Sequence, residues 1–379
     1  MNSNYLETAT RIGARLCRDA LWSDNRCNWT ADELSGNQKV HVALGPNIYS
    51  GTAGIALFLW RLWRATGERV FQITAEAALR QSLSKIIGAG RGLYSGGLGI
   101  LYASAEIRGE FDEVAVLGQA KPDRAELDLV SGATGAIAAL LGLYARTGSR
   151  ALLERAVRHG EMLLQEAVRT DTGWSWRTLK RDRHLTGFSH GASGIGWAGF
   201  ELWSATDDAR FHKMGLQAFR FERTCFSVVR GNWPDYRSEP PTYPVMWCHG
   251  AAGIALARLR CWSLSREPIL LEESRTALDT VKAYVGNLSN YSLCHGEAGN
   301  ADVLLFATQV LYDPECQRAA EKVAQEGLER FERRSAPWPC GVAGADETPE
   351  LMTGLAGIGY FYLRLADPSA TPSILLPGI

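Results

Sequence analysis

The chain has 379 residues, of which 46% are hydrophobic and 21% are charged, the balance of a globular protein rather than a disordered one. Its length allows one large domain or two to three ordinary ones. The formal net charge of −1 excludes the basic surface that nucleic acid or an anionic membrane would favour, so neither is expected as a partner.

The N-terminal segment, residues 1–22, is amphipathic and carries charges throughout. It has neither the apolar run nor the small-residue cleavage site of a signal peptide. No stretch of the chain approaches about 18 uncharged apolar residues, so no membrane span is predicted. We expect a cytoplasmic protein whose eight cysteines are reduced and whose cysteine chemistry is metal binding or catalysis rather than disulfide formation.

A short motif, G-x-x-G followed by a mostly apolar run, occurs seven times along the chain. The spacings between successive first glycines are 45, 36, 59, 59, 46 and 58 residues, and such self-similarity is typical of a repeat architecture. We number the copies one to seven in chain order. Their glycines are Gly51 and Gly54, Gly96 and Gly99, Gly132 and Gly135, Gly191 and Gly194, Gly250 and Gly253, Gly296 and Gly299, and Gly354 and Gly357.

The segments between the copies have the pattern of amphipathic helices, and strand-like alternation is almost absent. Residues 270–285 and 315–334 show the pattern, and so do residues 150–169. The apolar stripe of this last segment consists of Leu152, Leu153, Ala156, Val157, Gly160, Leu163, Leu164 and Ala167. Each repeat therefore reads as an amphipathic helix followed by an apolar one.

Burial in two layers would place the apolar helices inside and the amphipathic helices outside. We predict an all-α fold, an α/α toroid of about seven helical hairpins that forms a single domain over residues 1–379, with an open solenoid as the competing topology. In most copies the glycines have a structural explanation. Glycine tolerates positive φ at a turn and lets the start of a helix pack closely on its neighbour.

Copies four, five and six carry side chains that can bind a metal or transfer a proton. His190 precedes the first glycine of copy four, Cys248-His249 precede that of copy five, and Cys294-His295 precede that of copy six. The other copies have Tyr-Ser, Val-Ser or Met-Thr there. In a closed ring, equivalent positions of successive repeats point at the same end of the central cavity, so we expect these five side chains to converge.

Thiolate sulfur and imidazole nitrogen are ligands that suit zinc. The spacing is not that of a zinc finger or ribbon, so the metal would join elements far apart in the sequence. Cys294 and His295 can both bind it from the turn before a helix, and Cys248 can add a third ligand. His249 would supply a fourth ligand in a closed structural site, whereas a catalytic site keeps that position open. The spacing does not decide between the two.

Three further features are candidates for the same cavity. Asp128, four residues before the first glycine of copy three, can orient a histidine or handle a proton, but it can equally cap the following helix. Trp247 is either a core aromatic residue or a wall of the site. The polar segment 231–237, GNWPDYR, is either a lip of the cavity or a plain surface loop. The remaining cysteines share no repeat position, and we interpret them as packing residues.

The motifs DLVSGATGAI, GFSHGASGI, NWPD, WCHGAAGI and SLCHGEAGN, in register with the remaining copies of G-x-x-G, resemble those of lanthionine synthetase C-like (LanC-like) cyclases. The resemblance covers essentially the whole chain and is closest to the C-terminal cyclase domain of type 2 (LanM-type) lanthipeptide synthetases. It implies an α/α toroid with one catalytic zinc near its centre. The ligands that it implies are Cys248, Cys294 and His295, with water or the substrate thiol in the fourth position.

The resemblance also implies roles for residues that do not bind the metal. His190 and Asp128 match the family's catalytic His and Asp, and His249 would lie beside the metal without binding it. Some stand-alone members have an Arg where this chain has Pro244. Arg237, in the segment 231–237, is the candidate replacement.

The chain begins at the cyclase, whereas type 2 synthetases carry a large N-terminal dehydratase domain. We therefore expect its partners to be a dehydrated precursor peptide with its leader and a separate dehydratase, unless the chain is a piece of a larger enzyme.

The activity that the resemblance implies is that of a zinc-dependent lanthionine synthetase. It adds peptide cysteine thiols to dehydroalanine or dehydrobutyrine and so forms (methyl)lanthionine thioether rings. One alternative is a related enzyme that adds glutathione or another external thiol to dehydrated residues. Another is a zinc-stabilised peptide-binding module without catalysis. A carbohydrate-processing toroid ranks last, because it needs paired carboxylates where this chain has Cys and His.

Overall fold

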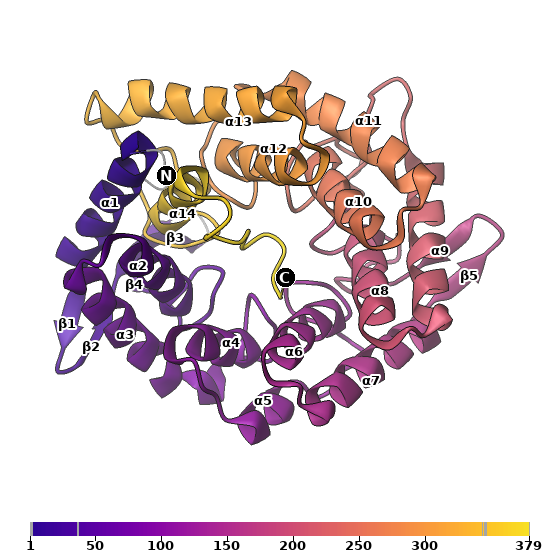
Figure 1. Ribbon diagram of the computed structural model, residues 1–379, viewed down its shortest axis with the longest axis horizontal. Coiled ribbons are helices and arrows are strands. Elements are labelled where there is room, and N and C mark those ends of the chain that lie inside the picture. Colours follow the sequence, from indigo (N-terminus) through magenta and orange to yellow (C-terminus); the bar gives the residue numbers. More distant parts are fainter. Residues whose placement is uncertain (1–2, 36–37, 343, 345–346, 379) are drawn as a thin grey trace.

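The helices of the chain form two concentric layers around a central axis (Figure 1). The computed structural model describes residues 3–35, 38–342, 344 and 347–378. In this described part, the inner layer consists of α2 (Thr52–Thr66), α4 (Gly97–Arg108), α6 (Ala133–Thr147), α8 (Ala192–Thr206), α10 (Ala251–Ser265), α12 (Glu297–Leu311) and α14 (Leu355–Ala366). The outer layer consists of α1 (Ser3–Arg18), α3 (Arg69–Ser84), α5 (Glu113–Gln119), α7 (Arg150–Glu166), α9 (Ala209–Cys225), α11 (Pro268–Tyr284) and α13 (Pro314–Gly327). The predicted α/α toroid is confirmed.

The pairing of the two layers differs from the order that the sequence pattern suggested. The inner helices α2, α6, α8, α10 and α12 each pack most extensively against the outer helix that follows, not the one that precedes, because only a short connection separates the two. The outer helix α1 packs against α14, the last inner helix. This contact between the first and last helices closes the toroid, so the open solenoid is excluded.

Burial follows the two kinds of helix. The inner helix α6 buries every residue from 133 to 143, as an apolar helix enclosed on all sides must. The outer helix α7 buries one stripe that includes Leu152, Ala156, Gly160 and Leu163, all of them predicted from the periodicity. The core therefore lies between the layers and within the inner one.

The glycines of the repeated motif are explained by close packing rather than by positive φ. The first glycine of each copy is the N-cap of an inner helix, and its φ lies between −115° and −145° in six copies. Only Gly250, with a φ of 85°, has a positive φ, which is the other explanation that the sequence offered. A Cβ on the second glycine of each copy would lie 1.7 to 2.2 Å from the carbonyl oxygen six residues earlier. The turn therefore folds back so tightly that no side chain fits.

The turns are joined by backbone hydrogen bonds that run once around the toroid. We call the residue two places before the first glycine of each copy the ring position, and the residue after it the flanking position. The bonds, from N–H to C=O, are Tyr49 to Tyr94 (2.9 Å), Tyr94 to Val130 (3.0 Å), Leu129 to Ser189 (3.0 Å), Ser189 to Cys248 (3.1 Å), Cys248 to Cys294 (3.3 Å), Cys294 to Met352 (2.9 Å) and Met352 to Tyr49 (2.9 Å). Every copy thus places its ring position at one end of the central cavity.

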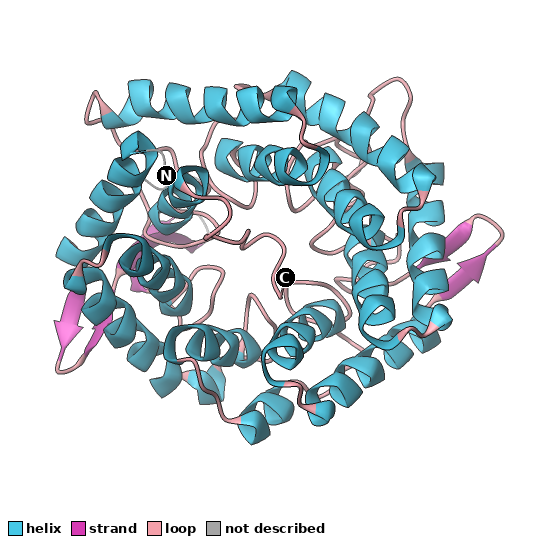
Figure 2. Cartoon of the chain, in the orientation of Figure 1, coloured by secondary structure: helices cyan, strands magenta, loops and turns pink. Residues whose placement is uncertain are grey.

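Three antiparallel hairpins interrupt the helices, and the sequence pattern did not predict them (Figure 2). Their strands are β1 (Leu21–Ser23) with β2 (Arg26–Asn28), β3 (Thr30–Ser35) with β4 (Gln38–Ala43), and β5 (Val168–Thr170) with β6 (Gly173–Ser175). A 3₁₀ turn (Ile86–Gly88) and a π-helical segment (Leu328–Glu332) complete the regular structure of the described residues. None of the described helices is long and apolar enough to cross a membrane.

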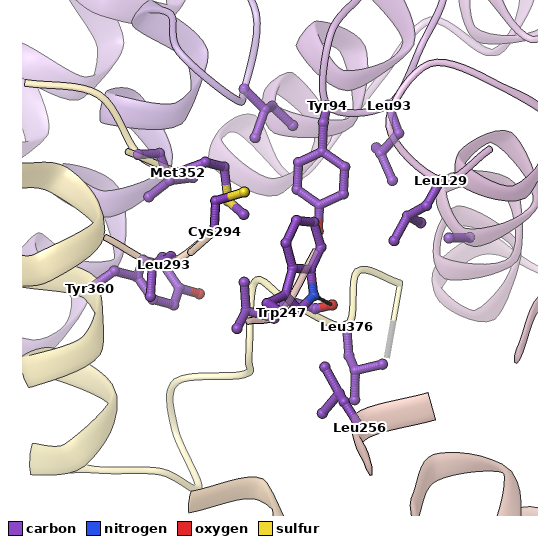
Figure 3. Packing of buried hydrophobic residues seen from close by; sticks show 14 of the residues in the cluster. Leu93, Tyr94, Leu129, Trp247, Leu256, Leu293, Cys294, Met352, Tyr360 and Leu376 are labelled. Atoms are coloured by element: carbon purple, nitrogen blue, oxygen red, sulfur yellow. Dashed lines mark hydrogen bonds between the residues drawn. The ribbon is translucent and has the colours of Figure 1, made fainter. Parts of the chain in front are cut away.

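The C-terminal segment, residues 367–378, turns into the centre of the toroid (Figure 1). The hydroxyl of Tyr94 donates a hydrogen bond to the carbonyl of Ile374 (2.7 Å), and the indole N–H of Trp247 donates one to the carbonyl of Leu375 (3.1 Å). Figure 3 shows the rings of Tyr94 and Trp247 next to each other, with Cys294 close by; their centroids are 5.6 Å apart. The end of the chain thus holds the side chains of Tyr94, in copy two, and Trp247, in copy five, through hydrogen bonds.

Candidate active site and metal centre

A pocket of about 420 Å³ lies where the turns before the inner helices meet. It is lined by Asn47, Tyr49, Ser50, Ser95, Val130, Ser189, His190, Arg237, Met246, Trp247, Cys248, Cys294 and His295. Six of the eight predicted site residues are among them, and the other two, Asp128 and His249, contact His190. A larger pocket of about 710 Å³, lined in part by Trp174 and Lys213, contains none of the eight. The expected convergence of copies four to six is thus found.

The two candidate thiol ligands are neighbours. Cys248 and Cys294 are the ring positions of copies five and six, and both are buried. A hydrogen bond between the two sulfur atoms raises the pKa of Cys248 and lowers that of Cys294 well below its usual value. The two thiols therefore lie close enough to polarise each other, and metal binding needs both of them as thiolates.

His295 is oriented by the segment that leads to α14. Its Nε2 lies 2.8 Å from the carbonyl oxygen of Gly341, which can only accept, so Nε2 carries a proton and Nδ1 is the nitrogen left to face Cys294 or a metal. A Cβ on Gly341 would lie 2.6 Å from Nε2, so only glycine allows this approach. The hydrogen bond between His295 and Cys294 raises the pKa of the imidazole. A backbone carbonyl behind a histidine is the usual support of a metal-binding imidazole.

Two sulfur atoms and one imidazole nitrogen fit zinc in type and in number for a site with one open position. The polarised thiol pair and the fixed tautomer of His295 agree with this assignment. Within residues 3–35, 38–342, 344 and 347–378, no three His, Cys, Asp or Glu side chains are already drawn together as a metal cluster. We therefore propose Cys248, Cys294 and His295 as zinc ligands because of the chemistry of their donor atoms.

His190 is held by Asp128. Its Nδ1 lies 2.7 Å from Oδ2 of Asp128, whose side chain is almost fully buried, whereas the imidazole of His190 is 19% exposed and faces the pocket. The other carboxylate oxygen accepts the N–H of Ser131 (2.8 Å). The N-cap of α6 is Gly132 and receives no side-chain cap, so the alternative that Asp128 caps this helix is wrong. The pair directs Nε2 of His190 away from the carboxylate.

His249 lies behind the pocket rather than in it. Its ring stacks on that of His190, with centroids 5.7 Å apart and planes at 29°, and its side chain is 1% exposed. Burial, with a contribution from Arg237, lowers its pKa to about 3, so the imidazole is neutral. Neither ring nitrogen has a hydrogen-bond partner among the described residues. The imidazole is thus a flat, neutral support for His190.

The segment 231–237 forms part of the pocket edge. Arg237 lines the pocket and is held by Asp235 through hydrogen bonds of 2.7 to 3.1 Å. Asn232 is buried and donates to the carbonyls of Tyr243 (3.0 Å) and Pro244 (2.9 Å). The alternative of a plain surface loop is therefore wrong. Arg237 supplies a guanidinium on the pocket wall although Pro244 supplies no side-chain charge.

Comparison with known proteins identifies the family. The family described as lanthionine synthetase C-like protein matches residues 42–376, most of the chain. The chain belongs to the lanthionine synthetase C-like family. The lacticin 481/lactococcin biosynthesis protein LcnDR2 of Lactococcus lactis subsp. lactis is 27% identical over 217 residues, which are 52% of this chain and only 22% of that longer protein.

Solved structures show the same fold at low identity. A nisin cyclase matches with a TM-score of 0.68 at 14% identity, over 99% of this chain and 98% of its own. A GH76 α-mannanase of Bacteroides thetaiotaomicron matches with a TM-score of 0.55 at 10% identity, over 96% and 95%. The LanC-like toroid is therefore an architecture that carries unrelated chemistry, and the site must decide the function. The residues that line the pocket include no Asp or Glu, unlike a glycosidase site.

Sequence reasoning missed some pocket residues in this LanC-like chain. Tyr49 is the ring position of copy one, and its hydroxyl hydrogen-bonds the sulfur of Cys294. Burial and the neighbouring thiols raise the pKa of Tyr49, so its phenol stays protonated and donates. Reading the ring position in every copy, not only in those with Cys or His, would have found it. Gly341 lies outside the repeated motif and carries no such signal.

Proposed function

We propose that the pocket is the active site of a zinc-dependent lanthipeptide cyclase, which adds peptide cysteine thiols to dehydroalanine or dehydrobutyrine to form thioether rings. One observation carries the proposal: the thiols of Cys248 and Cys294, the imidazole of His295 and the His190–Asp128 pair meet at one pocket. Membership of the lanthionine synthetase C-like family supports it.

The metal would be held by Cys248, Cys294 and His295. When bound there, zinc would lower the pKa of a substrate cysteine and keep it as a nucleophilic thiolate at neutral pH. Cys248 and Cys294 would supply the two anionic ligands that keep such a centre electron-rich. His249 would leave the fourth position open, since its ring is stacked on His190 rather than lining the pocket.

The protein's own acid is His190. In the addition, a carbon–sulfur bond forms at the β-carbon of the dehydrated residue, the C=C π bond breaks, and the α-carbon takes up a proton. The Nδ1–H of His190 is fixed on Asp128, so Nε2 is the atom that delivers this proton. The carboxylate stabilises the cationic imidazole before transfer, and the protein regains a proton from the thiol that enters.

Charge on the substrate carbonyl develops next to the pocket wall. Arg237, braced by Asp235, places a fixed positive charge there for the enolate oxygen. Trp247 is fully buried and lines the pocket, so it is both a core residue and a wall of the site. These two residues would orient the peptide rather than exchange protons.

The proposed substrate is a precursor peptide, with its leader, that already contains dehydroalanine or dehydrobutyrine. The relative from Lactococcus lactis is named for lacticin 481 biosynthesis, which supports a peptide substrate. We also propose a cytoplasmic location, where the eight free cysteines would stay reduced.

The test combines the zinc-loaded protein with a dehydrated, cysteine-containing peptide and counts free thiols by alkylation and mass spectrometry. Cyclisation removes alkylatable thiols without changing the peptide mass. A parallel reaction with glutathione distinguishes the external-thiol activity, because the product then gains the mass of glutathione. Thiols that all remain alkylatable, together with unchanged peptide that still binds, would favour a peptide-binding module and contradict the proposal.

A further inference from the structure

A buried charged cluster lies behind the turn that carries His190. Arg258 of α10 donates to Glu222 of α9 (2.8 Å), to Glu273 of α11 (2.8 Å) and to the hydroxyl of Ser193 (3.0 Å). Its guanidinium also stacks on Phe219, 3.7 Å from the ring centroid. Arg258, Glu222 and Ser193 are 0% exposed, whereas the Glu273 side chain is 10% exposed and also pairs with Arg223.

Glu222 is the member of the cluster that contacts the turn itself. Its Oε1 accepts the backbone N–H of Gly187 (2.7 Å) and that of Ser193 (3.0 Å), and its Oε2 accepts the hydroxyl of Ser193. One carboxylate thus clamps the turn on both sides of His190. Glu273 contacts Arg258 and Arg223 but no backbone group of this turn.

The clamped turn also supports the segment that carries the candidate metal ligand of copy five. Gly187 has a φ of 96°, and a Cβ there would lie 3.1 Å from Cα of His249 and 3.2 Å from the carbonyl oxygen of Cys248. Any shift of Gly187 would therefore alter the contacts of both His190 and His249, whose rings stack on each other.

Burying these charges is expensive, and an apolar cluster of similar volume is often at least as stable. In copies one, three and six a side chain of the turn itself accepts a turn N–H, and these side chains are Asn47, Asp128 and Ser292. In the copy with His190 the acceptor instead comes from an outer helix and is locked by an arginine. The free-energy cost of burying these charges therefore arises at the turn that positions the imidazole of His190.

We propose that Glu222 is a positioning residue for the cyclase reaction: it fixes the turn 187–193 so that His190 stays against Asp128 and aimed into the pocket. Arg258 holds Glu222 in place. Glu273 neutralises Arg258 together with Glu222 but does not contact the turn. This inference rests on the proposed function for its kinetic part, and on the hydrogen bonds alone for its structural part.

The experiment compares three variants of the full chain: Glu222→Met, Glu273→Met and Glu222→Gln. Both Met variants remove one carboxylate from the same buried arginine, but only Glu222→Met leaves the N–H groups of Gly187 and Ser193 without an acceptor. Glu222→Gln restores an acceptor oxygen without the charge. Each variant is measured for zinc content, thermal unfolding, kcat and KM, and for hydrogen exchange of the peptide that spans residues 185–195.

We expect kcat of Glu222→Met to be about 10- to 100-fold below that of Glu273→Met, with KM and zinc content similar, because small displacements of a reacting group have effects of this size. Glu222→Gln should recover most of the loss, and exchange of residues 185–195 should accelerate only in Glu222→Met. Equal losses in the two Met variants, or a Gln variant no better than Met, would overturn the inference. A wild-type protein without cyclase activity that still shows the exchange difference would refute the proposed function and leave the clamp standing.

Discussion

Copies four to six of the repeat and the other four copies share the same turn contacts, apart from the positive φ of Gly250, and differ in the side chains at the ring and flanking positions. All seven ring positions take part in the same closed series of hydrogen bonds, and all seven second glycines pack on a carbonyl of their own turn. The ring and flanking pairs are Ser189-His190, Cys248-His249 and Cys294-His295 in copies four to six, against Tyr49-Ser50, Tyr94-Ser95, Val130-Ser131 and Met352-Thr353 elsewhere.

The difference teaches that the scaffold and the chemistry are specified separately. The turn depends on glycine and on backbone groups, so it accepts Tyr, Val, Met, Ser or Cys at the ring position. Placing Cys and His in consecutive copies brings them together because the hydrogen bonds join each copy to the next. This separation can be tested with variants that change the reactive side chains but not the scaffold, and with variants that change the scaffold but not those side chains.

The largest effect is expected at a ring position that carries chemistry. Cys294→Ala should abolish both zinc binding and cyclisation while the fold persists, because Cys294 joins the ring through backbone groups that alanine keeps. Zinc content by metal analysis, circular dichroism and the thiol-counting assay check the three parts. Cys225→Ala, a thiol at the end of α9, is the matched control and should retain zinc and activity. Full zinc content in Cys294→Ala would show that Cys294 is not a ligand and that its ring position does not carry the proposed chemistry.

The next effect concerns a flanking position. His190→Gln should lower the cyclisation rate by about 10²- to 10⁴-fold, the usual contribution of a general acid, and should retain zinc. Ser131→Ala, at the flanking position of copy three, should leave the rate unchanged, because the N–H that binds Asp128 is preserved. Loss of zinc from His190→Gln would show that His190 is a ligand and that its assigned role is wrong.

The scaffold should respond equally in copies with and without chemistry. Gly253→Ala and Gly357→Ala place a Cβ 2.0 and 1.9 Å from a carbonyl oxygen, so each should lower the free energy of unfolding by about 3 kcal/mol. Gly88→Ala, where a Cβ meets nothing within 4 Å, is the control for thermal and denaturant unfolding. A much smaller loss in copy seven than in copy five would mean that the copies are not structurally equivalent.

A histidine outside the ring should affect stability alone. His159 of α7 is 2% exposed, and burial lowers its pKa to about 4. Between pH 6.5 and 4 the unfolded state binds a proton that the folded state does not, so stability falls as the pH is lowered through this range, by about 3 kcal/mol at most. His159→Gln should flatten that dependence in denaturant titrations at several pH values and leave zinc binding unchanged. An unaltered pH dependence would contradict the burial argument.

The repeated glycines made the toroid and the convergence of Cys and His predictable, because the same short signal recurs in every copy. Of the two explanations predicted for those glycines, close packing is confirmed in every copy, whereas positive φ holds only for Gly250. Two of the three hairpins were missed because their strands have three residues each, too few to show an alternating pattern. The strands β3 and β4 have six residues each, and they were not recognised from the sequence. Glu222 and Gly341 were missed because contacts between distant segments, not local pattern, bring each to the site. Tyr49 was missed because only the copies with Cys or His were considered, although it occupies the ring position of copy one.

The central claim is that three protein ligands leave a fourth metal position open to a thiol. The absorption spectrum of the Co²⁺-substituted protein, with and without an added thiol, tests it most directly, and His249→Gln serves as a companion. The account predicts a tetrahedral sulfur-rich spectrum that changes when the thiol is added, in both proteins. A spectrum that ignores the thiol in the wild type but changes in His249→Gln would reveal a closed Cys₂His₂ site and contradict the account.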